Sequence, residues 1–126
     1  MFHREPIMNT NNIVGKIGED IAAAYLISQG YAIAYRNLRI GRDEIDIIAR
    51  KEELYICIEI KSRLSTKAGV AEANLTHAKL KRLKRSAMAF SHTYNIPESR
   101  IRIEALALDI DFNKKLANIK HFLRIV

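Results

Sequence analysis

Residues 44–61 read EIDIIARKEELYICIEIK, two apolar runs separated by four charged residues. The runs, residues 44–49 and 54–61, each have the length of a β-strand, and the polar segment 50–53 predicts a tight turn that joins them as an antiparallel hairpin. Side chains alternate along a strand, so Glu59 and Lys61 are expected on one face of the second strand. Charged residues at positions where a strand is otherwise apolar make this hairpin the most informative part of the chain.

The hairpin is expected to bring two carboxylates together. With a two-residue turn near residues 51–53, Asp46 falls opposite Glu59 or one diagonal step away, which corresponds to roughly 5–8 Å. Two carboxylates at that separation repel each other unless a cation lies between them, and a hard divalent cation such as Mg²⁺ takes oxygen ligands. Lys61 would then lie beside a metal-bound water, an arrangement that suits phosphodiester cleavage. The alternative is an exposed hairpin face with a Glu–Lys pair that adds little stability.

Hydrophobic periodicity and turn residues assign the rest of the chain. We predict a helix over 13–28, capped by Asn11 or Asn12 and ended by Gly30, and a strand over 31–38 before a turn at 39–43. Beyond the hairpin, we expect an irregular segment (62–75), a helix (76–93), a connection (94–99), a strand (101–110), a turn (111–115) and a last strand (119–126). This order, α-β-β-β-α-β-β, predicts an α/β fold with a central mixed β-sheet flanked by helices, in one domain over residues 1–126 with residues 1–11 as a flexible N-terminal tail.

The net charge of +7 is concentrated in one part of the chain. Residues 1–75 carry ten Lys/Arg and ten Asp/Glu, whereas residues 76–126 carry eleven Lys/Arg and four Asp/Glu, so the second part holds the whole excess. Within the predicted helix 76–93, five cations surround a one-sided apolar stripe: Lys79, Lys81, Arg82, Lys84 and Arg85. A dense basic helix face attracts polyanions. The alternative is a solvated helix face whose long side chains cover the edge of the core.

Composition excludes several classes of protein. With 48% hydrophobic and 28% charged residues, the chain is neither disordered nor fibrous, and Cys57 as the single cysteine excludes a disulfide scaffold. Cys57 lies in an apolar run and is expected to be a buried small side chain. No stretch approaches the ~20 apolar residues of a membrane span, and the N-terminus has no export signal, so we expect a cytoplasmic protein without a membrane partner.

Two minor features are interpreted as structural. Gly15 and Gly18 lie in a GKIG stretch that lacks the Walker pattern of a phosphate-binding loop, and helix packing or capping explains them better. The four histidines show no metal-ligand spacing, although His77 could approach a phosphate at the start of the basic helix. The five Tyr and four Phe do not cluster near the basic residues in the sequence, so no base-stacking platform is predicted.

Several blocks in a fixed order resemble the YraN-like family of small predicted endonucleases, in the PD-(D/E)xK nuclease superfamily. The blocks are residues 15–26 (GKIGEDIAAAYL), 30–31 (GY), 36–39 (RNLR), 44–49 (EIDIIA), 58–63 (IEIKSR), 72–73 (EA) and 79–83 (KLKRL), so the resemblance spans about residues 13–110. Two positions depart from the pattern: Ile45 stands where the superfamily often has proline, and Asp43 stands where the family has glycine. The second departure adds a carboxylate beside the expected site.

The resemblance implies a restriction-endonuclease-like fold with the active site on the second and third elements of the sheet. It implies that Asp46, Glu59 and Lys61 form the nuclease core, with Glu19 of the first helix as an auxiliary acidic residue. Asp46, Glu59 and Glu19 would hold Mg²⁺ or Mn²⁺, with the Ile60 carbonyl as a further potential ligand. Small nucleases of this fold often act as dimers, so a homodimer stays open.

The leading hypothesis is therefore a metal-dependent endonuclease acting on DNA, with branched or single-stranded DNA among the substrates to consider. Arg63 and the five cations of the basic helix would contact backbone phosphates, which gives sequence-tolerant, salt-dependent binding. One alternative is a binding module that holds nucleic acid, or a partner protein, without cleaving it. Another is an interaction protein whose basic helix binds an acidic partner.

Overall fold

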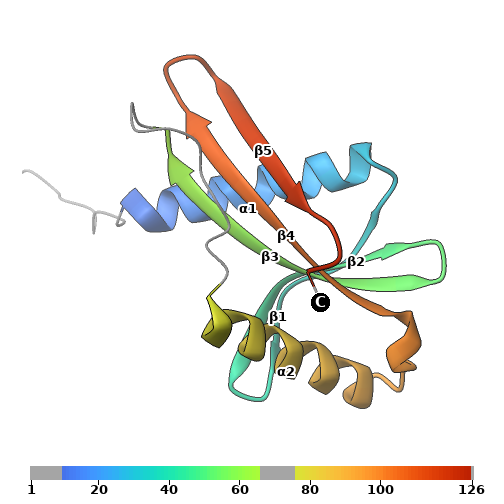
Figure 1. Ribbon diagram of the computed structural model, residues 1–126. Helices are drawn as coiled ribbons and strands as arrows, with labels where there is room; N and C mark the ends of the chain where they lie inside the picture. The colour runs from blue at the N-terminus through green and yellow to red at the C-terminus, as the bar shows by residue number, and fades with distance from the viewer. Residues whose placement is uncertain (1–9, 66–75, 126) are drawn as a thin grey trace, which may run out of the picture.

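The computed structural model describes residues 10–65 and 76–125. Its elements in chain order are α1 (Thr10–Ser28), β1 (Ala32–Ile40), β2 (Asp43–Lys51), β3 (Leu54–Leu64), α2 (His77–Thr93), a short 3₁₀ helix (Glu98–Arg100), β4 (Ile101–Asp111) and β5 (Leu116–Phe122). The predicted α/β class and the order α-β-β-β-α-β-β are confirmed (Figure 1). Within residues 10–65 and 76–125, the single 3₁₀ turn before β4 is the one element that the sequence did not predict.

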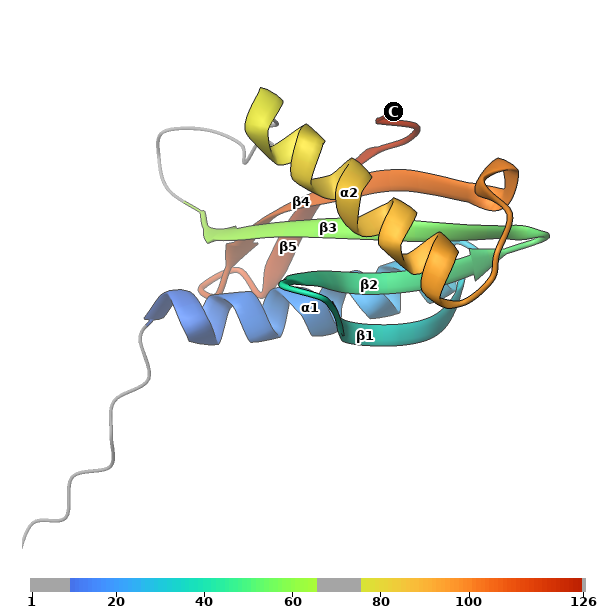
Figure 2. The ribbon, with the colours of Figure 1, turned by 90° about the horizontal axis from the view of Figure 1, so that it is seen from below.

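The five strands form one sheet in the order β1-β2-β3-β4-β5. All neighbours are antiparallel except β3 and β4, which run parallel and make the sheet mixed. Parallel neighbours need a long crossover connection, and here that crossover contains α2. Figure 2 shows the consequence: α1 covers one face of the sheet and α2 covers the other.

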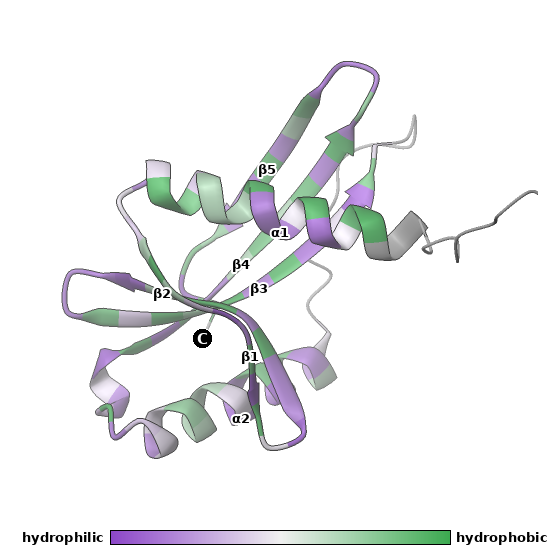
Figure 3. Ribbon diagram, turned by 180° about the vertical axis from the view of Figure 1, so that it is seen from behind, coloured by the Kyte–Doolittle hydropathy of each residue, from purple (hydrophilic) through white to green (hydrophobic). Residues whose placement is uncertain are grey.

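Each face of the sheet has its own hydrophobic core. Ile47 and Ile58 face α1 and pack with Leu26, whereas Ile48 and Cys57 face α2 and pack with Phe90. This alternation confirms the strand assignment on both arms of the hairpin, and Cys57 is a buried small side chain as expected. Burial raises the pKa of its thiol to about 12. Figure 3 shows hydrophobic and hydrophilic bands alternating along α1 and β5, as expected for elements with one buried face.

The start of α1 differs from the prediction. The helix begins at Thr10, so Asn11 and Asn12 lie inside its first turn rather than at its N-cap position. The amide groups of a first helical turn have no partner within the helix, so polar residues are tolerated there and give no apolar signal of the start. Residues 1–9 of the predicted tail lie outside the described residues.

Several strand boundaries also differ from the prediction. β2 covers Asp43–Lys51 instead of 44–49, because its pairing with β3 continues to Lys51. β1 continues to Ile40 because it stays paired with β2 up to Asp43, so the expected turn at 39–43 shrinks to two residues. β3 continues to Leu64 because its parallel pairing with β4 extends to Ile110, which converts residues 62–64 of the predicted irregular segment into strand. β5 starts at Leu116 instead of residue 119 and ends at Phe122, because its antiparallel pairing begins directly after the turn that follows Asp111.

Gly18 brings α1 unusually close to β3. A Cβ atom at this position would lie 1.8 Å from the Ser62 Oγ atom and 2.7 Å from the Ser62 Cβ atom, so only glycine fits. Helix packing is therefore the use of this glycine, as predicted. The next residue, Glu19, lies near enough to Asp46 of β2 to raise the pKa of that carboxyl group.

We expect Gly18→Ala to lower the free energy of unfolding by about 1–3 kcal/mol, because overpacking must push α1 away from β3. Gly15→Ala is the matched control, since a Cβ atom there meets nothing within 4 Å. It should stabilise the same helix by up to about 1 kcal/mol through helix propensity. Urea denaturation of both variants measures the difference. Equal stability of the two variants would contradict the close packing of α1.

Candidate active site

The acidic residues of the hairpin lie where β2 and β3 separate. The two strands pair from Lys51–Leu54 to Ile47–Ile58, and beyond that point β2 pairs only with β1 while β3 pairs only with β4. The turn between them has two residues instead of the four of the predicted polar segment 50–53, which places Asp46 and Glu59 one step beyond the last pair. We call the point bounded by these two residues the strand fork. Figure 1 shows β3 continuing beside β4 while the β1–β2 hairpin bends toward α2.

The Asp46 carboxylate takes the place of a missing strand contact. Its Oδ2 atom accepts a hydrogen bond from the backbone N–H of Ile60 at 2.8 Å, so the side chain, rather than the β2 backbone, pairs with β3 at the fork. Burial, and after it the nearby Glu59 carboxylate, raise the pKa of Asp46 to about 7, against the lowering effect of the Ile60 hydrogen bond. Glu19 and Glu44 add smaller repulsion. Asp46 is therefore a carboxylate that lacks compensating positive charge.

Glu19 reaches the same region from α1, through contacts with β1. The amide of Asn37 lies between two carboxylates, and with its nitrogen facing them it donates to Glu19 Oε1 at 2.8 Å and Glu44 Oε1 at 3.3 Å. Arg36 lies 3.9 Å from Glu19 and forms a closer ion pair, 2.7 Å, with Asp20. The structure thus brings Glu19 near Asp46, where the family resemblance expects an auxiliary acid.

Asn37 is a site residue that the sequence did not predict, although it lies in the RNLR segment (36–39) of the family resemblance. The structure shows that it is the polar bridge between the α1 and β2 carboxylates, with a left-handed backbone conformation (φ 52°) inside β1. Asparagine is depleted in strands and tolerates positive φ. An asparagine between the apolar positions of a strand is thus the signal that could have found it.

Glu59 is paired in the structure with a cation from α2. Its Oε1 atom lies 3.1 Å from the Arg82 Nη2 atom. One helical turn later, Arg85 forms a two-pronged ion pair with Asp43 of β2, at 2.8 and 2.9 Å. The Arg85 hydrogen bonds lower the pKa of Asp43 to about 2, so this carboxylate stays ionised. The extra carboxylate at position 43, which departs from the family pattern, therefore fastens α2 to β2.

Lys61 projects from the strand face predicted for it. Ile58 and Ile60 pack in the α1-side core, so Glu59 and Lys61 share the opposite face of β3. The Lys61 side chain is exposed, and no Asp or Glu within residues 10–65 or 76–125 forms an ion pair with it. Its ammonium group is available beside the fork.

The six predicted phosphate-binding cations do not share one environment. Lys79, Lys81 and Lys84 form no ion pair with the described residues, whereas Arg82 and Arg85 hold Glu59 and Asp43. Arg63 is also engaged, because its Nε atom donates to the buried Asp109 at 2.8 Å. Three lysines of α2 thus present free charge to solvent, and the three arginines carry structural contacts that sequence reasoning did not predict.

The residues at the strand fork fit a hard divalent cation in chemistry, although they are not already gathered as a complete ligand set. Asp46 and Glu59 offer oxygen donors, and the raised pKa of Asp46 marks a place where positive charge is missing. Among the described residues, no three His, Cys, Asp or Glu side chains converge as a metal-binding group. Mg²⁺ commonly keeps several waters and binds through one or two carboxylates, so the two acids suffice as protein ligands.

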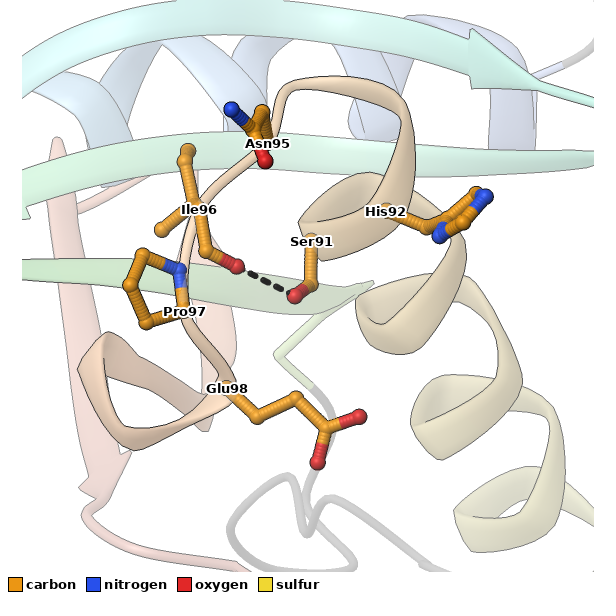
Figure 4. A pocket seen from close by; sticks show the side chains of 6 residues that line it. All are labelled: Ser91, His92, Asn95, Ile96, Pro97 and Glu98. Carbon is orange, nitrogen blue, oxygen red and sulfur yellow. Dashed lines mark hydrogen bonds between the residues drawn. The ribbon is translucent and has the colours of Figure 1, made fainter.

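A pocket lies at the C-terminal end of α2, apart from the strand fork. It has a volume of about 360 Å³ and is lined by Ser91, His92, Asn95, Ile96, Pro97 and Glu98 (Figure 4). The Ser91 hydroxyl donates to the Ile96 carbonyl, a contact that closes the loop after the helix. The pocket lies more than two helical turns from Arg82 along α2 and contributes nothing to the strand fork.

Aromatic side chains gather at the C-terminal end of α2, away from the basic residues 79–85. The rings of Tyr35 and Tyr94 lie 5.5 Å apart, and Phe90 lies 4.9 Å from Tyr94. Tyr35 comes from β1 and lies more than fifty residues away in the sequence. The cluster forms by folding and leaves no local pattern in the sequence.

The family model of the uncharacterised protein family UPF0102 matches residues 18–110. The chain belongs to this family. A UPF0102 protein of Phocaeicola vulgatus is 37% identical over 101 residues, which cover 80% of this chain and 83% of that protein. A UPF0102 protein of Chloroherpeton thalassium is 36% identical over 110 residues, 87% of this chain and 85% of that protein. UPF0102 is the YraN-like family that the sequence motifs indicated, so that part of the prediction is confirmed.

Among solved structures, the chain is similar to SfsA of Pyrococcus furiosus, a structure described as a complex with Ca²⁺. The TM-score is 0.41 at 16% identity, with 89% of this chain and 63% of that chain covered. A likeness of this size carries no inference about activity. In the part of the chain that the structure describes, neither helix has the length and apolar character needed to cross a membrane.

Proposed function

We propose that this UPF0102 protein is a divalent-metal-dependent endonuclease of the PD-(D/E)xK type that hydrolyses DNA phosphodiester bonds. The observation that carries the proposal is the strand fork, where Asp46 and Glu59 stand one step beyond the last β2–β3 pair with Lys61 on the same face of β3. A hairpin face without a ligand would not need an aspartate whose burial raises its pKa to about 7.

Each residue of the fork has a separate task in this proposal. Asp46 and Glu59 hold Mg²⁺ or Mn²⁺, which when bound supplies Lewis acidity and an activated water. Lys61 orients that water through its exposed ammonium group. Glu19, held near Asp46 by Asn37, adds a further carboxylate for a second ion or for an ordered water.

The basic helix gives the proposed enzyme its hold on the substrate. Lys79, Lys81 and Lys84 project from α2, the same helix that reaches the fork through Arg82. Contacts with phosphates carry no sequence information, so binding is expected to be sequence-tolerant and to weaken as salt concentration rises.

A second candidate function is a nucleic-acid-binding module without catalysis. The observation in its favour is that Glu59 is engaged by Arg82, so one of the two proposed ligands is neutralised by the protein itself. The exposed Tyr35–Tyr94 pair at the end of α2 would suit stacking of unpaired bases in such a module.

A cleavage assay on a panel of labelled DNA substrates separates the two candidates. The panel contains linear duplex, nicked duplex, single strands, flaps and four-way junctions, each with Mg²⁺, Mn²⁺ or EDTA. The nuclease proposal expects metal-dependent cleavage of at least one substrate and none in EDTA. Salt-sensitive binding to the same panel without cleavage would instead support the binding module.

A further inference from the structure

The Arg82–Glu59 pair occupies a carboxylate that the proposed function needs. Arg82 Nη2 lies 3.1 Å from Glu59 Oε1, and the two side chains are 33% and 21% exposed. Both groups are thus partly open to solvent at the surface of the strand fork. An ion pair in such a position contributes on the order of 1 kcal/mol or less, so it can exchange partners at small cost.

The Arg85–Asp43 ion pair of the same helix serves as a comparison for the Arg82–Glu59 pair. Arg82 reaches β3 at Glu59, and Arg85, one turn later, reaches β2 at Asp43. The two arginines therefore tie α2 to both strands on either side of the fork. Glu59 raises the pKa of Asp46, whereas Asp43 is not among the groups that do so. Only the Arg82 pair involves an acid of the fork.

We propose that Arg82 is an exchangeable counter-ion: it neutralises Glu59 in the metal-free protein and releases it when a divalent cation binds at the fork. This inference rests on the proposed function. A carboxylate oxygen that coordinates a cation has less negative charge to offer a guanidinium, so Arg82 loses its partner in the metal-bound protein.

The released Arg82 is well suited to hold the substrate. A guanidinium binds phosphate through two parallel N–H···O bonds, and α2 already presents the exposed Lys81 and Lys84 and the half-buried Lys79. Arg82 is thus a positioning residue that couples occupation of the fork to the binding of the nucleic-acid backbone. DNA affinity should accordingly rise when a divalent cation is bound.

Calorimetric titration with Mn²⁺ alone tests the exchange without measuring activity. Arg82→Gln should tighten Mn²⁺ binding about fivefold, because the competing cation is gone. Arg85→Gln is the matched control: it removes an equal charge and an ion pair from the same helix without touching Glu59, and should change Mn²⁺ affinity less than twofold. Arg82→Lys keeps the charge and should bind Mn²⁺ within about twofold of the wild type.

Fluorescence anisotropy of labelled DNA with and without Ca²⁺ tests the second half of the inference. The wild-type protein should bind DNA more tightly with Ca²⁺ than without it. The increase in DNA affinity caused by Ca²⁺ should be about fivefold smaller for Arg82→Gln, because one charge-assisted contact is missing. If Arg82→Gln and Arg85→Gln bind Mn²⁺ equally, the exchange is overturned while the proposed function stands. If the wild-type protein binds no Mn²⁺ at millimolar concentration, the proposed function itself fails.

Discussion

Asp46→Ala is expected to reduce divalent-metal-dependent DNA cleavage by at least about 1000-fold, which corresponds to roughly 4 kcal/mol of transition-state stabilisation. The reason is that Asp46 supplies a partly buried carboxylate of the strand fork, where its Oδ2 atom accepts the Ile60 N–H. Lys61→Ala should also reduce the cleavage rate, because the exposed ammonium group beside Glu59 is proposed to orient the attacking water. Single-turnover cleavage of the best substrate in the panel, with Mn²⁺, gives both rates.

Measurements of DNA binding show whether the loss is confined to the cleavage step. Both variants should bind DNA within about threefold of the wild type, because the phosphate-contacting lysines of α2 are untouched. Lys81→Ala is the matched surface change, and it should weaken DNA binding modestly and reduce the salt dependence without abolishing cleavage. Cleavage that survives in both Asp46→Ala and Lys61→Ala would show that the strand fork is not the catalytic site.

Asp46→Asn should make the protein more stable at pH 8, by at least about 1 kcal/mol and by up to about 4 kcal/mol. The variant keeps an oxygen that accepts the Ile60 N–H and removes a charge whose folded-state pKa is raised to about 7 by burial and by Glu59. In the unfolded chain the same group has a pKa near 3.8. Ionisation of Asp46 above pH 7 therefore works against folding.

The sign of the pH dependence follows from this shift. A carboxyl group with a raised folded-state pKa favours the folded protein below the unfolded pKa, and this contribution is lost as the pH rises from about 4 through 7. In thermal melts, the melting temperature of Asp46→Asn should exceed that of the wild type by about 4 °C or more at pH 8. Near pH 4 the two melting temperatures should be equal. Addition of Mn²⁺ should raise the melting temperature of the wild type alone. A lower stability of Asp46→Asn at pH 8 would contradict this electrostatic account.

Local patterns in the sequence were sufficient for the hairpin and its acids. The two-residue turn after Lys51 and the alternation of residues 54–61 placed Asp46 opposite Glu59 and Lys61 beside it, because strand periodicity and turn length are short-range properties. They were not sufficient for the length of β3, since residues 62–64 become strand only through parallel pairing with β4, about forty-five residues later.

The contacts that complete the site are long-range and left no signal in the sequence. Arg82 and Arg85 formed part of a basic helix face, and only the docking of α2 shows which carboxylates they hold. The separation of β2 and β3 was equally invisible, because an alternating strand predicts continued pairing up to its end. Asp46 then bonds the Ile60 N–H in place of a backbone partner. Helix docking and strand separation depend on the whole sheet.

The central claim is that the strand fork holds a divalent cation, and Mn²⁺ titration of one double variant at pH 8 tests it most directly. Asp46→Asn with Glu59→Gln removes both proposed carboxylate ligands and keeps their size and hydrogen-bonding shape. Electron paramagnetic resonance of free Mn²⁺ should show that the wild-type protein binds the ion at millimolar concentration or below and that the double variant does not. Equal binding by the two proteins, or none by the wild type, would contradict the assignment of the fork as a metal site.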